Sequence, residues 1–140
     1  MIPPASLWRQ IPRLALYGLG LIALLVILHV LYMVVYGYII NPGQTPAHYP
    51  AHAAASGPWF SIIVGTPLFF LVALRLGRRH GSDGFSQAML LTALYVAIDV
   101  GMVVAAGSSF FHPVFIVAMA SKFAAAYAGA RTGMRRGPAA

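Results

Sequence analysis

The sequence predicts an all-α, polytopic membrane protein, a four-helix transmembrane bundle with both termini in the cytoplasm. Hydrophobic residues make up 60% of the 140 residues and charged residues only 8%, whereas a soluble domain carries about 25% charged residues. Mean hydropathy is +0.81. The apolar residues fall into four stretches, each near or above the roughly 20 residues that a spanning helix needs.

These stretches follow one another in a single transmembrane domain, residues 1–140. The spans are expected at residues 14–40, 58–76, 85–107 and 113–130. Asn41, Pro42 and Gly43 end the first span, because Asn and Gly suit a helix C-terminus and Pro cannot continue the helix. A short connection makes the last two spans antiparallel neighbours. Residues 41–57 are expected to form an external loop.

The basic residues predict the orientation. The chain has nine Lys and Arg residues and a net charge of +7. All of them except Lys122 lie before the first span, between the second and third spans, or after the fourth span. With four crossings these three segments are on the same side of the membrane. The positive-inside rule places that side in the cytoplasm. We therefore expect a multi-pass protein of the inner cell membrane.

The same charge distribution limits the partners. A basic soluble chain would suggest nucleic acid, but no face combines aromatic and basic residues to read bases, so nucleic acid is not expected. The expected partners are the lipid bilayer and either further copies of this chain or another membrane protein.

Two charged residues lie inside spans. Asp99 is eight residues before Gly107, and Lys122 is nine residues after Pro113. At 1.5 Å per residue both are roughly 12–14 Å from the outer ends of their helices, close to the middle of the bilayer. An unpaired charge there costs about 2.5–3.5 kcal/mol. The matched depth predicts an ion pair; the alternative is a different partner for each residue, such as another subunit.

Other spans bring polar groups to a similar depth. Thr92 and Tyr95 share a helical stripe with Asp99. His29 lies about 16 Å from the outer end of the first span. Thr66 precedes Pro67, which removes a backbone donor and predicts a helix kink. Asp99, Lys122, His29, Thr66, Tyr95 and Thr92 form a predicted intramembrane polar cluster. A histidine in a span is more often a packing residue than a proton carrier, and a proline there is more often only a structural kink.

The external loop holds a second candidate site, His48 and His52. A spacing of four residues can bind a metal on a helix, but Pro50 lies between them and argues against one continuous helix. No Cys, Asp or Glu lies nearby. We therefore predict no metal site and no cofactor. The sequence contains no nucleotide-binding or hydrolase motif and no catalytic residue set, so an enzyme is not expected.

Three functions fit these features. The favoured one is a transport or ion-coupled protein that uses Asp99 and Lys122 with His29 as a relay, because ionisable residues within spans mark pathways. The alternative is a non-catalytic accessory or assembly subunit, in which the ion pair fixes helix register. A third possibility is a binder of haem or quinone near His29 and the neighbouring tyrosines.

Overall fold

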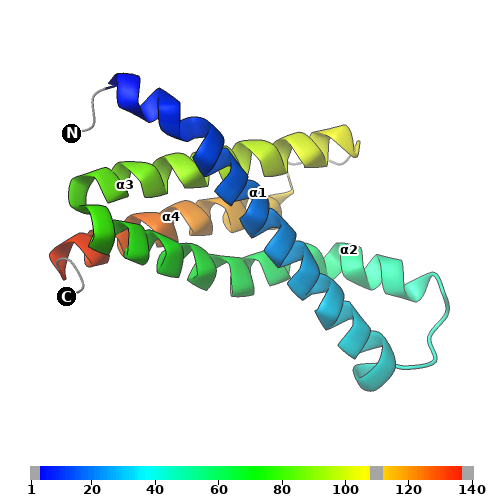
Figure 1. Cartoon of the computed structure of the whole chain (residues 1–140). Helices are drawn as coiled ribbons and strands as arrows, with labels where there is room; N and C mark the ends of the chain where they lie inside the picture. The colour runs from blue at the N-terminus through cyan, green and yellow to red at the C-terminus, as the bar shows by residue number, and fades with distance from the viewer. Residues whose placement is uncertain (1–3, 108–111, 137–140) are drawn as a thin grey trace.

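The computed structural model describes residues 4–107 and 112–136. Within these ranges the chain is helical and has no strand. In chain order the segments are α1 (Pro4–Val35), the π-helical η1 (Tyr36–Ile40), α2 (His48–Phe60), the π-helical η2 (Ser61–Gly65), α3 (Thr66–Ala105) and α4 (Pro113–Arg135). Figure 1 shows their arrangement.

Among the described residues, three helices, rather than the predicted four, are long and apolar enough to cross a membrane. They are Arg9–Ile40, His48–Ala105 and Pro113–Arg135. The predicted spans at residues 58–76 and 85–107 both fall in the second of these, which has a sharp kink with non-helical backbone at Gly81 between them. The all-α class and the membrane-compatible composition are thus confirmed, and the four-way division is not.

The long second helix is not straight. Gly81 has φ 56° and ψ −127°, which lie outside the helical region. A side chain rarely adopts this positive φ, whereas glycine does so without steric cost. Figure 1 shows α3 reversing direction there, so that its two arms run back along each other. We call residues 66–80 the first arm and residues 82–105 the second arm.

The predicted external loop is shorter than expected. Asn41 ends η1 and Gly43 has φ 78°, as a helix stop requires. The helix α2 then begins at His48 and runs through Pro50, so the argument against one helix through both histidines is wrong. Pro50 lies in the first turn of α2, where the backbone N–H groups have no helical partner and proline costs nothing.

The tightest packing joins α3 to α4. Buried small residues line this interface, including Ala73, Ala126 and Ala130. At Gly129 an added Cβ would collide with the carbonyl oxygen of Phe70. The two backbones approach this closely only because the position lacks a side chain.

The helix α1 crosses the two arms of α3 obliquely (Figure 1). It contributes Ile22 and Leu25 to a core with Phe69, Tyr95 and Ala125. Its remaining surface is apolar and exposed, with Leu16 67% and Val26 56% accessible. Such a helix is stable when lipid or another apolar surface covers it.

Candidate functional site

A small cavity lies where α1, α2, η2 and the second arm of α3 meet. Its volume is about 150 Å³, and its polar lining residues are His29, Ser61, Tyr95 and Asp99. These residues come from three separate stretches of sequence, so the fold alone brings them together. Apolar residues complete the wall: Ile22, Leu25, Val26, Gly57, Phe60 and Met102.

Asp99 is partly buried at the edge of this cavity. Within residues 4–107 and 112–136, no hydrogen bond or salt bridge satisfies its carboxylate. A charged group in apolar surroundings is costly unless it is paired or binds something. The Asp99 carboxylate is therefore free to accept a proton or a cation from the cavity.

Lys122 is fully buried, with 0% of its surface accessible. Its ammonium donates hydrogen bonds to Ser61 Oγ at 2.7 Å and to the Ala118 carbonyl oxygen at 3.0 Å. Its Nζ atom also lies 5.6 Å from the centre of the Tyr95 ring, within the range of cation–π attraction. The buried ammonium is thus stabilised by two neutral oxygen atoms and by the face of an aromatic ring, and not by a carboxylate among the described residues.

The direct ion pair predicted between Asp99 and Lys122 is not formed in the described part of the chain. The hydroxyl of Ser61 takes the place of the carboxylate at Nζ. Ser61 and Asp99 line the same cavity, so the serine that binds the Lys122 ammonium and the Asp99 carboxylate border one space. Equal depth on neighbouring helices was not enough to bring them into contact.

The π-helical segment η2 gives Ser61 this position. It occupies Ser61–Gly65 and precedes Pro67, the second residue of α3. Pro67 removes the backbone donor that would bond the Ile63 carbonyl, and π-helical turns recur at functional sites. At Gly65 a Cβ would lie 3.2 Å from Lys122 Cε, so the small residue leaves room for the lysine.

The predicted threonines divide between two roles. Thr66 donates a hydrogen bond to Ser121 Oγ at 2.9 Å, and Ser121 donates to the Ala118 carbonyl at 3.0 Å. This carbonyl is the one that Lys122 uses, so Thr66 belongs to the lysine's surroundings. Thr92 is buried and donates to the Ala88 carbonyl within its own helix at 2.8 Å. Its hydroxyl is satisfied there.

A ladder of histidine and tyrosine side chains joins α1 to α2. Tyr36 Oη lies 3.0 Å from His48 Nε2, and Tyr32 Oη lies 3.0 Å from His52 Nε2. The Tyr36 and His52 rings stack with centroids 3.7 Å apart. Residue spacings of four on each antiparallel helix place these side chains opposite one another. His48 and His52 therefore face α1, and the ladder occupies both of them.

His29 forms the inner end of this ladder. Its Nε2 atom lies 3.1 Å from Ser56 Oγ, and Ser56 donates weakly to the Ala53 carbonyl at 3.4 Å. The His29 and Tyr32 rings stack at 6.0 Å. Because His29 also lines the cavity, it connects the ladder to the surroundings of Asp99.

Sequence reasoning missed Ser61 and Ser56. Serine is common in membrane helices, and neither residue lies in a motif. One signal was present: Ser61 is six residues before Pro67, in the turn that the proline disturbs.

Within the described ranges, no group of three His, Cys, Asp or Glu side chains is placed to hold a metal ion. In a comparison with known proteins, no protein family, curated protein or solved structure matches this chain. The physical arrangement of the cavity and ladder therefore carries the functional argument.

Proposed function

We propose that this chain is an ion-coupled membrane protein in which Asp99 binds a proton or a small cation inside the membrane. The observation that supports it is the Asp99 carboxylate, which borders a cavity of about 150 Å³ without a partner in the described part of the chain. Ionisable residues that face an internal cavity mark ion pathways in membrane proteins.

Lys122 supplies the opposing charge in this proposal. Its ammonium donates a hydrogen bond at 2.7 Å to the hydroxyl of Ser61, a residue that lines the cavity. The positive charge stabilises an ionised Asp99 through space and leaves the carboxylate open to a proton. A direct salt bridge would compete with the incoming ion for the same oxygens.

The histidine and tyrosine ladder is the proposed route to Asp99. It begins near the end of α1, where Asn41 donates to Tyr36 Oη at 3.0 Å, and it ends at His29. From Tyr36 to His29 the ladder covers roughly 10 Å along the helix. Imidazole carries protons because its two nitrogens can release one and accept another. Successive rungs are joined by ring stacking, so in this proposal water molecules carry the proton from one rung to the next.

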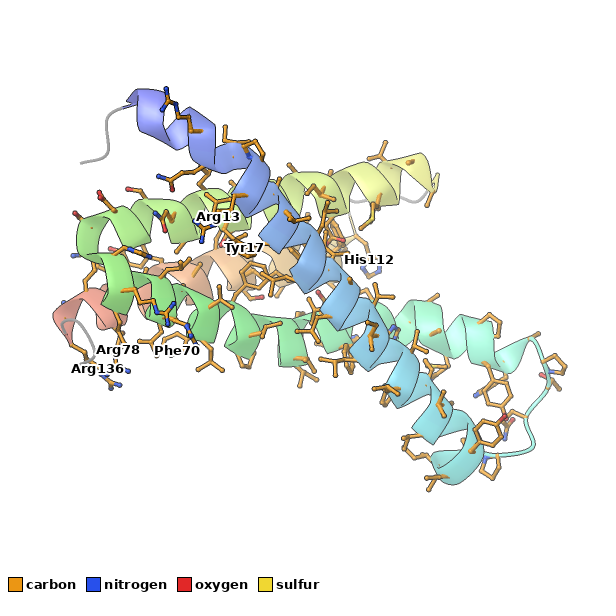
Figure 2. The ribbon with its side chains drawn as sticks, in the orientation of Figure 1. Arg13, Tyr17, Phe70, Arg78, His112 and Arg136 are labelled. Carbon is orange, nitrogen blue, oxygen red and sulfur yellow. The ribbon has the colours of Figure 1, made fainter. Side chains whose placement is uncertain are left out.

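We further propose that the chain crosses a bacterial inner membrane four times and that both of its ends lie in the cytoplasm. The reversal at Gly81 supports it, because it separates residues 58–80 from residues 82–105, and each of these helical stretches is of spanning length. Arg13, Arg78 and Arg136 lie toward one end of the molecule (Figure 2). This asymmetry agrees with the positive-inside rule.

The chain has no cysteine, which makes the topology easy to test. Single cysteines replace Gln44, Ser82 or Arg136, and a membrane-impermeant thiol reagent labels intact cells. We expect labelling at position 44 alone, with labelling at 82 and 136 only after the membrane is opened. Labelling of Ser82→Cys in intact cells would contradict four crossings.

Ion coupling is tested with purified protein in liposomes that hold a pH-sensitive dye. We expect proton uptake under an imposed potential, and Asp99→Asn should reduce it by about tenfold or more. Asp83→Asn is the matched control, since Asp83 is the other acid of the chain and lies beside the Gly81 bend. Uptake by Asp99→Asn equal to that of the parent would refute the proposal, as would parent uptake no faster than empty liposomes.

A second candidate function is that of an accessory subunit in a larger membrane complex. It is favoured by the apolar surface of α1, where Leu16, Val26 and Ile27 are more than half exposed. Lipid covers such a surface equally well. Mild extraction followed by native electrophoresis separates the two: a subunit migrates with a partner, whereas the ion-coupled protein migrates alone or with copies of itself.

A further inference from the structure

A larger groove lies between the first half of α1 and the two arms of α3. Its volume is about 740 Å³, within the range of small-molecule sites. The helix α1 forms one side and the two arms form the floor. Arg13 and Tyr17, labelled in Figure 2, mark the place where α1 crosses α3. The groove is separate from the Asp99 cavity, which none of these residues lines.

One end of the groove is strongly basic. Arg13, Arg75, Arg79 and His80 all line it, and no acidic residue does. Arg13 donates one hydrogen bond, from its Nε atom to Tyr17 Oη at 3.2 Å. Its terminal nitrogens, and the whole guanidinium groups of Arg75 and Arg79, have no hydrogen-bond partner within the described residues. Arginine presents several donors in a planar fork that matches a phosphate.

The rest of the groove is apolar. Leu21, Leu24 and Val72 line it away from the arginines, and Gly20 leaves a gap in the wall of α1. A Cβ built at Gly20 meets nothing within 4 Å. The groove therefore offers an anionic headgroup site and an apolar channel in sequence along one surface. A free phosphate would use only the first of these features.

We propose that this groove binds one anionic phospholipid, with its phosphate on Arg13, Arg75 and Arg79 and an acyl chain along Leu21 and Leu24. Two features of the groove select this occupant. Uncompensated positive charge favours an anionic headgroup over a zwitterionic one. The apolar channel faces the surface of a helix that lipid already covers, so an acyl chain enters it without leaving the bilayer.

The proposal is tested on the delipidated full chain in a mild detergent. Phosphatidylglycerol and phosphatidylcholine with the same acyl chains are titrated separately. Bound lipid is counted by native mass spectrometry, and the rise in unfolding temperature reports occupancy. We expect phosphatidylglycerol to bind at least about tenfold more tightly, because each basic residue near an anionic lipid adds to its attraction.

Matched variants locate the site. Arg75→Gln with Arg79→Gln should remove the preference for phosphatidylglycerol. Arg135→Gln with Arg136→Gln removes the same charge outside the groove and should leave the preference intact. In case the groove variant does not fold, Gly20→Phe introduces a ring into the apolar channel at a position where an added Cβ has nothing within 4 Å. Gly101→Phe is its control at another position with the same open space.

Three results would overturn the proposal. Equal affinities for phosphatidylglycerol and phosphatidylcholine would show that the groove does not select an anionic headgroup. An equal loss in the two double-arginine variants would show general charge attraction instead of a site. Glycerol phosphate has no acyl chain. If it bound as tightly as phosphatidylglycerol, the groove would be a site for soluble anions and not for a lipid. None of these outcomes bears on proton uptake through Asp99.

Discussion

The Lys122 ammonium donates a 2.7 Å hydrogen bond to Ser61 Oγ, and this serine lines the cavity that Asp99 also borders. A neutral hydroxyl in this position satisfies the buried cation without neutralising it. The positive charge is therefore still available to act on Asp99. Four predictions follow from the contacts around this serine, the ladder and the packing of α4.

Replacing Ser61 with Ala should lower the free energy of unfolding by about 1.5–3 kcal/mol. The reason is that a hydrogen bond to a buried charged group is lost. Thermal unfolding in detergent measures the change. Ser86→Ala is the control, because the Ser86 hydroxyl is exposed and donates only a long bond of 3.4 Å to the Ser82 carbonyl. Equal losses in the two variants would show that the Ser61 contact contributes nothing.

Double-mutant cycles should separate the two partners of Lys122. Cycles of Ser61→Ala and of Asp99→Asn, each with Lys122→Met, give the two coupling energies. We expect more than about 1 kcal/mol for Ser61, which is in direct contact with Lys122, and a smaller coupling for Asp99, which acts on Lys122 only through space. A larger coupling for Asp99 would restore the direct ion pair predicted from sequence.

Tyr36→Phe should destabilise the protein by about 1 kcal/mol, because the Tyr36 hydroxyl accepts a hydrogen bond from Asn41 and forms a second one with His48 Nε2. The same change should slow proton uptake in liposomes if the ladder is the route to Asp99. Tyr38→Phe is the control on the same π-helical segment, where Tyr38 is 82% exposed. Loss of stability with unchanged uptake would assign the ladder a structural role alone.

Two glycine substitutions should have opposite signs. Gly129→Ala should cost about 1–3 kcal/mol, because the new Cβ meets the Phe70 carbonyl and forces α3 and α4 apart. Gly101→Ala should gain up to about 1 kcal/mol, because alanine is the better helix former and the position is open. Denaturant or thermal unfolding measures both. A stabilising effect at Gly129 would mean that the two helices are not in backbone contact.

Much of the fold follows from composition. The apolar stretches predict membrane-compatible helices, and the Asn41–Gly43 stop predicts the end of the first one. The structure differs from the division into four helices at residues 77–84, where the chain reverses at Gly81 and no loop separates the two arms of α3. The α2 helix was hidden by Pro50, whose effect depends on its position in the helix.

The site was predictable in outline. Depth counting placed His29, Asp99 and Lys122 near one another, and the structure brings His29 and Asp99 to one cavity. Depth does not fix helix rotation, however, and rotation decides whether Lys122 faces Asp99 or Ser61. The pairing of Tyr36 with His48 and of Tyr32 with His52 could not be predicted from the sequence, because it depends on how α2 packs against α1.

The oblique course of α1 across α3 (Figure 1) has a consequence for the bilayer. The apolar run from residue 14 to residue 40 is about 40 Å long at 1.5 Å per residue. A hydrocarbon core of about 30 Å accommodates this length when the helix tilts. A thicker membrane reduces the tilt, and His29 lies on the tilting helix. Bilayer thickness and the shape of the cavity beside Asp99 are therefore mechanically linked.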